Sequence, residues 1–93
     1  MRKLWWDDAW NDYINWQSED KKYLRRINKL ITDIERNGYN GIGKPEPLKG
    51  SLAGWWSVKI DDANRLVFKI AGELENSERN LEIYACKGHY DDK

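Results

Sequence analysis

The strongest periodic signal in the chain lies in residues 20–37, where apolar side chains recur at helical spacing. The apolar positions are Tyr23, Leu24, Ile27, Leu30, Ile31 and Ile34. Their i, i+3, i+4, i+7 order predicts one apolar face of an amphipathic helix, with lysines and arginines on the other side. Ser18 or Asp20 can cap the start of this helix, and Gly38 suits the positive φ at which many helices end.

A strand and a shorter helix are predicted before it. Residues 2–6, with the sequence RKLWW, indicate a short first strand. Helical spacing of apolar side chains then predicts a helix over residues 8–17. Asp7 or Asp8 is expected to be its N-cap, because acidic side chains are favourable at a helix start.

Apolar and polar residues alternate on both sides of the sequence DDAN, and this predicts a β-hairpin. If Val58 pairs with Leu66, both side chains lie on the core face, and Lys59 lies opposite Arg65. A last strand is expected over residues 81–87. The predicted order is therefore β-α-α-β-β-β, an α+β fold in which two helices pack on one face of a mainly antiparallel sheet.

Length and composition narrow the class of protein. Ninety-three residues suit one domain, residues 1–93. The chain has 16 basic and 16 acidic residues, and this balance argues against a general nucleic-acid binder. Acidic residues gather towards the C-terminal end, so a local basic site in the middle of the chain remains open.

The cellular location is also constrained. The single cysteine, Cys86, cannot form an internal disulfide, which fits a reducing compartment. The apolar run near the start, Leu4 to Trp6, is too short for a signal peptide. No stretch approaches the roughly 20 apolar residues of a membrane helix. We therefore expect a cytoplasmic protein without a membrane segment.

The sequence KPEPLKG, in a predicted loop over residues 38–52, contains both prolines of the chain. Pro45 has a fixed φ, and Pro47 restricts Glu46 to extended conformations. Lys44 and Lys49 stand on either side, and positive charge nearby favours the ionised carboxylate. The alternative interpretation of these seven residues is a rigid loop with a solvated glutamate.

Other residues could complete an active site. His89 is the only histidine, and imidazole can transfer protons near neutral pH. Arg65 could hold a phosphate with its planar guanidinium, and Tyr90 could stack on a base. Each could instead be an ordinary surface or anchoring side chain. One histidine and one cysteine do not make a zinc site, and we find no phosphate-binding or dinucleotide-binding loop. We therefore predict no metal and no cofactor.

Four motifs now make the chain recognisable. In order, they are W..DAW.DY..WQ..DK, GKPEPLKG.L.G.WS, RLVF and AC..HY. With the amphipathic helix between them, they resemble the YoeB/Txe family of bacterial toxins in the RelE superfamily. The likeness covers most of the chain.

The resemblance implies a metal-independent endoribonuclease that cleaves messenger RNA in the decoding site of the ribosome. By motif, Glu46 would be the general base and His89 the general acid. Arg65 would stabilise the transition state, and Tyr90 would position the RNA. Lys59 would contact phosphate.

The same resemblance implies further contacts and partners. Lys44 and Lys49 would also meet the RNA phosphates. The implied partners are the ribosome, messenger RNA and a YefM/Axe-type antitoxin, and a homodimer is also allowed. Two other functions stay open at this point: a non-cleaving ribosome- or protein-binding module of the same fold, and a tryptophan-rich protein-interaction domain.

The chain departs from the family pattern in three places. Two arginines usually follow the Trp-Ser pair, whereas Val58 and Lys59 stand here. The residues Asp91–Lys93 follow the histidine-tyrosine pair, where the family often ends. The acidic turn AGELENSERN is also longer than usual.

Overall fold

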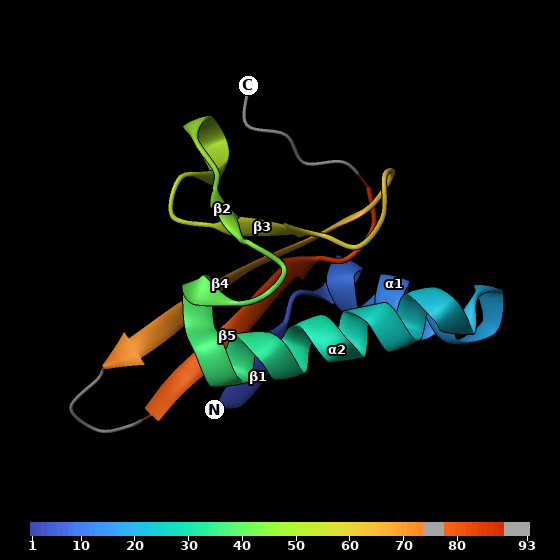
Figure 1. The fold of residues 1–93 in the computed structure, drawn as a ribbon, viewed down its shortest axis with the longest axis horizontal. Coiled ribbons are helices and arrows are strands. Elements are labelled where there is room, and N and C mark those ends of the chain that lie inside the picture. Colours follow the sequence, from blue (N-terminus) through green and yellow to red (C-terminus); the bar gives the residue numbers. More distant parts are fainter. Residues whose placement is uncertain (74–77, 89–93) are drawn as a thin grey trace.

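A computed structural model of the chain describes residues 1–73 and 78–88. Two helices and five strands make up its main elements (Figure 1). The strands are β1 (Arg2–Trp5), β2 (Glu46–Pro47), β3 (Trp56–Lys59), β4 (Arg65–Glu73) and β5 (Glu78–Ala85). The helices are α1 (Asp7–Glu19) and α2 (Lys21–Asn37), with short 3-10 turns η1 (Gly38–Asn40) and η2 (Gly50–Leu52).

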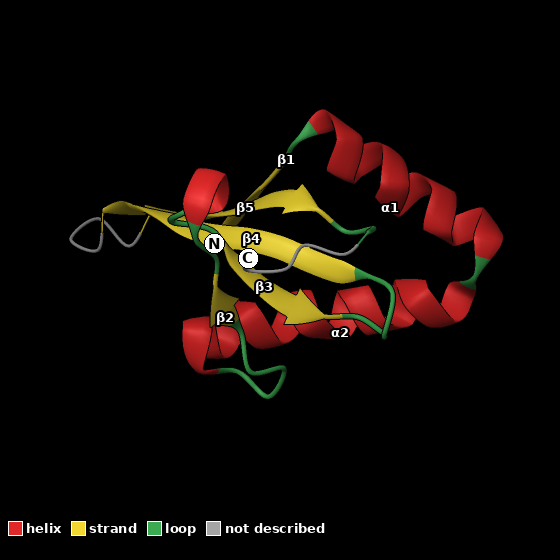
Figure 2. Cartoon of the chain, turned by 90° about the horizontal axis from the view of Figure 1, so that it is seen from above, coloured by secondary structure: helices red, strands yellow, loops and turns green. Residues whose placement is uncertain are grey.

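The strands form one sheet in the order β1-β5-β4-β3-β2. β1 runs parallel to β5, and the other pairs are antiparallel. In Figure 2 the strands lie over α2, and α1 runs beside the sheet on the β5 side. The α+β class, the two helices on one face and the mainly antiparallel sheet were all predicted correctly.

The core fills the space between the helices and the sheet. Its buried members from α2 are Ile27, Leu30, Ile31 and Ile34. They meet buried side chains of the strands, among them Val58, Leu66, Phe68, Leu81 and Ile83. The helical spacing in the sequence therefore identified the packed face of α2.

The predicted hairpin register is confirmed. Val58 pairs with Leu66, and Lys59 pairs with Arg65. Asp20 caps α2, since its carboxylate accepts the Lys22 backbone N–H at 2.9 Å. Gly38 has the expected positive φ of 59° at the end of α2.

Three local predictions were wrong. The N-cap of α1 is Trp6, without a side-chain cap bond, and Asp7 and Asp8 lie in the first turn instead. The expected loop over 38–52 contains a strand, β2, because the two prolines favour extended backbone there. The last strand begins earlier, at Glu78, and ends at Ala85.

Among the described residues, the helices are too short or too polar to span a membrane.

Candidate active site

Glu46 lies on β2 at the edge of the sheet, opposite Ser57 of β3. Its side chain is exposed. Pro47 lacks an N–H donor, which an edge strand tolerates. The prolines on both sides of Glu46 therefore hold the carboxylate on stiff extended backbone, as the sequence predicted.

The loop that leads to Glu46 is tied to α2. The Ile42 backbone N–H donates to Asp33 Oδ2 at 2.9 Å, and Asp33 Oδ1 accepts from Asn37 Nδ2 at 2.8 Å. A Cβ atom at Gly41 would collide with the Asp33 carboxylate. The helix thus fixes where the Glu46 strand begins.

Arg65 is on the same face of the sheet as Glu46. Residues that pair across antiparallel strands share a face, as do residues two apart on one strand. Glu46 pairs with Ser57, and Lys59, two residues further on, pairs with Arg65. The Arg65 guanidinium Nη1 donates to Ser57 Oγ at 3.4 Å. We call this surface the open face, because the neighbouring Leu66 points into the helix-covered core.

Ser57 was not singled out from the sequence. It is 1% exposed and lies between the strand of Glu46 and the side chain of Arg65. Its place in the alternating hairpin pattern and at the end of the motif GKPEPLKG.L.G.WS was a signal, but the sequence analysis gave this serine no role in the site.

The three lysines predicted to bind phosphate lie on the strands of the open face or next to them. Lys44 and Lys49 lie before and after β2 and are exposed. Lys59 Nζ lies 2.8 Å from Asp62 Oδ1. Both of these side chains are well exposed, so the ion pair is weak and an incoming phosphate can compete for the lysine.

His89 and Tyr90 lie outside the described residues. Gly88, directly before His89, is described, and its carbonyl accepts the Arg65 backbone N–H at 2.8 Å. The start of the C-terminal segment is therefore bonded to the strand end that carries Arg65.

A small apolar cluster supports the open face. Its buried members are Leu48, Trp55, Val67 and Ala85, with Tyr84 packed against them. The Lys69 ammonium lies 4.5 Å from the centre of the Trp55 ring. Trp55 is thus buried rather than a platform for bases, while Trp6, which contacts it edge-on, is 45% exposed.

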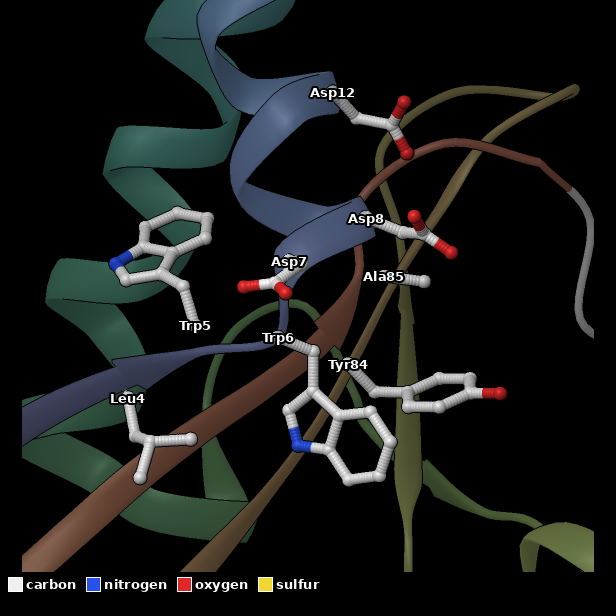
Figure 3. Close-up of a pocket in the computed structure, with 8 residues that line it drawn as sticks. All are labelled: Leu4, Trp5, Trp6, Asp7, Asp8, Asp12, Tyr84 and Ala85. Carbon is white, nitrogen blue, oxygen red and sulfur yellow. The ribbon is translucent and has the colours of Figure 1, made fainter.

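A hollow of about 630 Å³ lies elsewhere, at the start of α1 (Figure 3). Trp6, Tyr84 and the carboxylates Asp8 and Asp12 line it, whereas neither Glu46 nor Arg65 does. Partial burial raises the pKa of Asp12, and the positive charge of Lys87 opposes that rise. In the described part of the chain, no three His, Cys, Asp or Glu side chains gather as a metal site would require.

Comparison with known proteins identifies the family. A family model, described as "YoeB-like toxin of bacterial type II toxin-antitoxin system", matches residues 5–90. The chain belongs to this family. The toxin YoeB of Streptomyces coelicolor is 52% identical over 90 residues, which is 97% of this chain and 100% of that protein.

Solved structures of YoeB toxins share the fold. The YoeB/ParE toxin from Agrobacterium tumefaciens is 41% identical, with a TM-score of 0.91 over 97% of this chain and 100% of that one. The YoeB–YefM complex from Staphylococcus aureus contains a chain 37% identical, with a TM-score of 0.83 over 97% of this chain and 98% of that one. The family predicted from the motifs is thus confirmed, and this YoeB-family chain is a toxin of a toxin–antitoxin system.

Proposed function

We propose that this YoeB-family toxin is a metal-independent endoribonuclease that cleaves messenger RNA in the decoding site of the ribosome and so blocks translation. The observation that carries the proposal is the shared face of Glu46 and Arg65, joined through Ser57. This arrangement offers a carboxylate base and a forked cation to one bound phosphodiester. Residues 1–93 act in this proposal as one toxin domain in the cytoplasm.

The reaction follows from the chemistry of these groups. Glu46 takes the proton of a ribose 2′-hydroxyl, and the 2′-oxygen attacks the adjacent phosphorus. The bond from phosphorus to the 5′-oxygen breaks, and the imidazolium of His89 protonates that oxygen. The products are a 2′,3′-cyclic phosphate and a 5′-hydroxyl end.

Cations stabilise the transition state of this reaction. Arg65 can hold two phosphoryl oxygens with its fork, and it already accompanies Glu46 on the open face. Lys59 lies opposite Arg65, and Lys44 and Lys49 flank the strand of Glu46. These lysines would bind neighbouring phosphates as point charges. Tyr90 would position the RNA.

A YefM/Axe-type antitoxin is the proposed partner that restrains the toxin. The Staphylococcus aureus YoeB–YefM complex supports this, because its toxin chain has the same fold. A YoeB dimer from the same organism likewise supports a homodimer. The remaining partners, ribosome and messenger RNA, follow from the proposed reaction.

Primer extension on messenger RNA in programmed ribosomes tests the proposal. We expect the wild-type protein to cut within the decoding site with magnesium as the only divalent ion, restored after chelator treatment. A strict requirement for zinc or manganese would contradict metal-independent chemistry.

Glu46→Gln should lower the single-turnover cleavage rate about 100- to 10,000-fold, the usual contribution of a general base. Glu19→Gln, an exposed glutamate at the end of α1, is the matched control and should cleave like the wild type. Growth arrest that persists with Glu46→Gln, without cleavage, would instead support the non-cleaving binding module.

A further inference from the structure

The turn between β3 and β4 is built around one carboxylate. Asp61 Oδ1 accepts the backbone N–H groups of Ala63 and Asn64 at 2.8 and 2.7 Å, and Asn64 Nδ2 at 3.2 Å. A hydrogen bond from Tyr23 is the main reason that the pKa of Asp61 is lowered. Because an aspartate that binds backbone two residues on makes a preformed turn, the position of Asn64 is fixed.

The Asn64 side chain also reaches the far end of the chain. Its Oδ1 accepts the Gly88 backbone N–H at 2.9 Å. The amide therefore uses one of its two N–H donors on Asp61 and its oxygen on Gly88. Asn64 is partly buried, so water replaces these bonds only in part.

Both backbone polar groups of Gly88 form hydrogen bonds with residues that are distant in the chain. Its N–H donates to Asn64, and its carbonyl accepts from the Arg65 backbone N–H at 2.8 Å. Its φ of 94° is a conformation that other residues rarely adopt. These bonds lie beyond Ala85, the last residue of β5, so strand pairing is not what holds Gly88.

We propose that Asn64 is a positioning residue that sets where the segment carrying His89 and Tyr90 leaves the fold relative to Arg65. The inference rests on the proposed function. Gly88 is the residue directly before His89 in the chain. Fixing both polar atoms of Gly88 therefore fixes the starting point of the proposed general acid.

The Arg65 side chain completes the connection. Its backbone N–H binds Gly88, and its guanidinium binds Ser57 Oγ, which lies opposite Glu46. Arg65, at the start of β4, is thus bonded both to Gly88, which precedes the proposed acid His89, and to Ser57, which pairs with the proposed base Glu46. A displacement of about 1 Å between reacting groups can cost about 100-fold in rate, so loss of the Asn64 contact should slow cleavage rather than weaken ribosome binding.

Asn64→Ala is the first test, with Asn11→Ala on α1 as the matched exposed asparagine. We expect the single-turnover cleavage rate at saturating ribosome to fall about 10- to 100-fold, while the half-saturating ribosome concentration stays unchanged. In the free toxin, amide hydrogen exchange of Gly88 should accelerate, and that of the β4 residues beyond Arg65 should not.

Asn64→Gln is the rescue variant. Its side-chain amide keeps a donor for Asp61 Oδ1 and an acceptor for the Gly88 N–H on a side chain that is one methylene longer. We expect it to recover most of the cleavage rate and the Gly88 protection that Asn64→Ala loses. A purely structural loss of the turn would instead lower thermal stability in step with activity.

The outcomes separate the two proposals. A wild-type protein that does not cleave would overturn the proposed function and this inference with it. A wild-type protein that cleaves, together with Asn64→Ala that cleaves equally well, would overturn the inference alone. So would unchanged Gly88 exchange in Asn64→Ala, or a rescue variant as slow as Asn64→Ala.

Discussion

The two faces of the sheet differ in what they bury. On the helix-covered face, Phe68 and Leu66 are fully buried beneath an apolar surface of α2. On the open face, the charged and polar side chains of Glu46, Lys59 and Arg65 lie beside the small apolar cluster around Trp55 and Val67. Both surfaces are formed by the same strands. Successive side chains along β3 and β4 point to opposite faces of the sheet, and this alternation alone separates the two surfaces.

This difference indicates that the helix-covered face contributes mainly to stability and the open face mainly to the proposed cleavage. Stability comes mainly from apolar area removed from water, and most of the buried apolar side chains in the described chain lie towards the helices. The open face can therefore present cations and a carboxylate on one surface without disrupting the packing of the core. Variants of the two faces should separate stability from cleavage.

The largest effect on stability is expected from Phe68→Ala. This side chain is 0% exposed, and truncation of a buried phenylalanine costs about 3–5 kcal/mol in unfolding free energy. Urea denaturation followed by tryptophan fluorescence measures it. A loss below about 1 kcal/mol would show that the helix-covered face is not the main source of stability.

Two C-terminal deletions should differ from each other in cleavage, and neither should change stability much. Removing Asp91–Lys93 should leave the cleavage rate intact, because the proposed acid and Tyr90 remain. Removing Tyr90–Lys93 should lower the rate about 100-fold or more, with the thermal midpoint nearly unchanged. If both deletions are equally inactive, the acidic end takes part in the site and our assignment of its members is wrong.

Cys86, which is buried in the core under the helices, should make the unfolding free energy of the protein depend on pH. Burial raises the pKa of its thiol to about 12, and its Sγ donates to the Ala9 carbonyl at 3.4 Å. The unfolded chain loses this proton near its ordinary pKa of about 8.5, whereas the folded chain keeps it. The unfolding free energy should therefore fall as pH rises from about 8.5 towards 12.

The expected loss from Cys86 is roughly 1–2 kcal/mol at pH 10. Cys86→Ala removes this group, so the difference in unfolding free energy between wild type and variant should shrink over that pH range. A difference that stays constant from pH 8 to pH 10.5 would contradict the buried neutral thiol.

Lys59→Arg should have the smallest effect. The position lies opposite Arg65 at the exposed end of the hairpin, and a guanidinium can bind phosphate as well as an ammonium does. We expect cleavage to be equal to or faster than that of the wild type. A loss as severe as that of Lys59→Ala would show that the shape of this side chain, and not only its charge, matters.

The sequence allowed the framework of the covered face to be predicted. Helical spacing in α2 identified Ile27 and Ile34 as buried, and the alternation around DDAN yielded the register that places Lys59 opposite Arg65. Both signals are periodic and local, which is why they can be read from one chain.

What escaped prediction depends on contacts between distant residues. β2 is only two residues long, so it has no period of its own, and pairing with β3 defines it. The Asn64 contact joins residues 24 positions apart. Trp6 is the N-cap of α1, and its backbone N–H donates to the Ile83 carbonyl of β5. The sequence of the first helix alone could not reveal this contact with β5.

The most direct test of the proposed chemistry is one deoxynucleotide in the messenger. Replacing the ribose at the scissile position with 2′-deoxyribose removes the hydroxyl that Glu46 is proposed to deprotonate, and codon–anticodon pairing is retained. We predict that single-turnover cleavage at that bond on programmed ribosomes becomes undetectable, while the all-ribose messenger yields a 2′,3′-cyclic phosphate. Equal cleavage of both messengers would contradict the account.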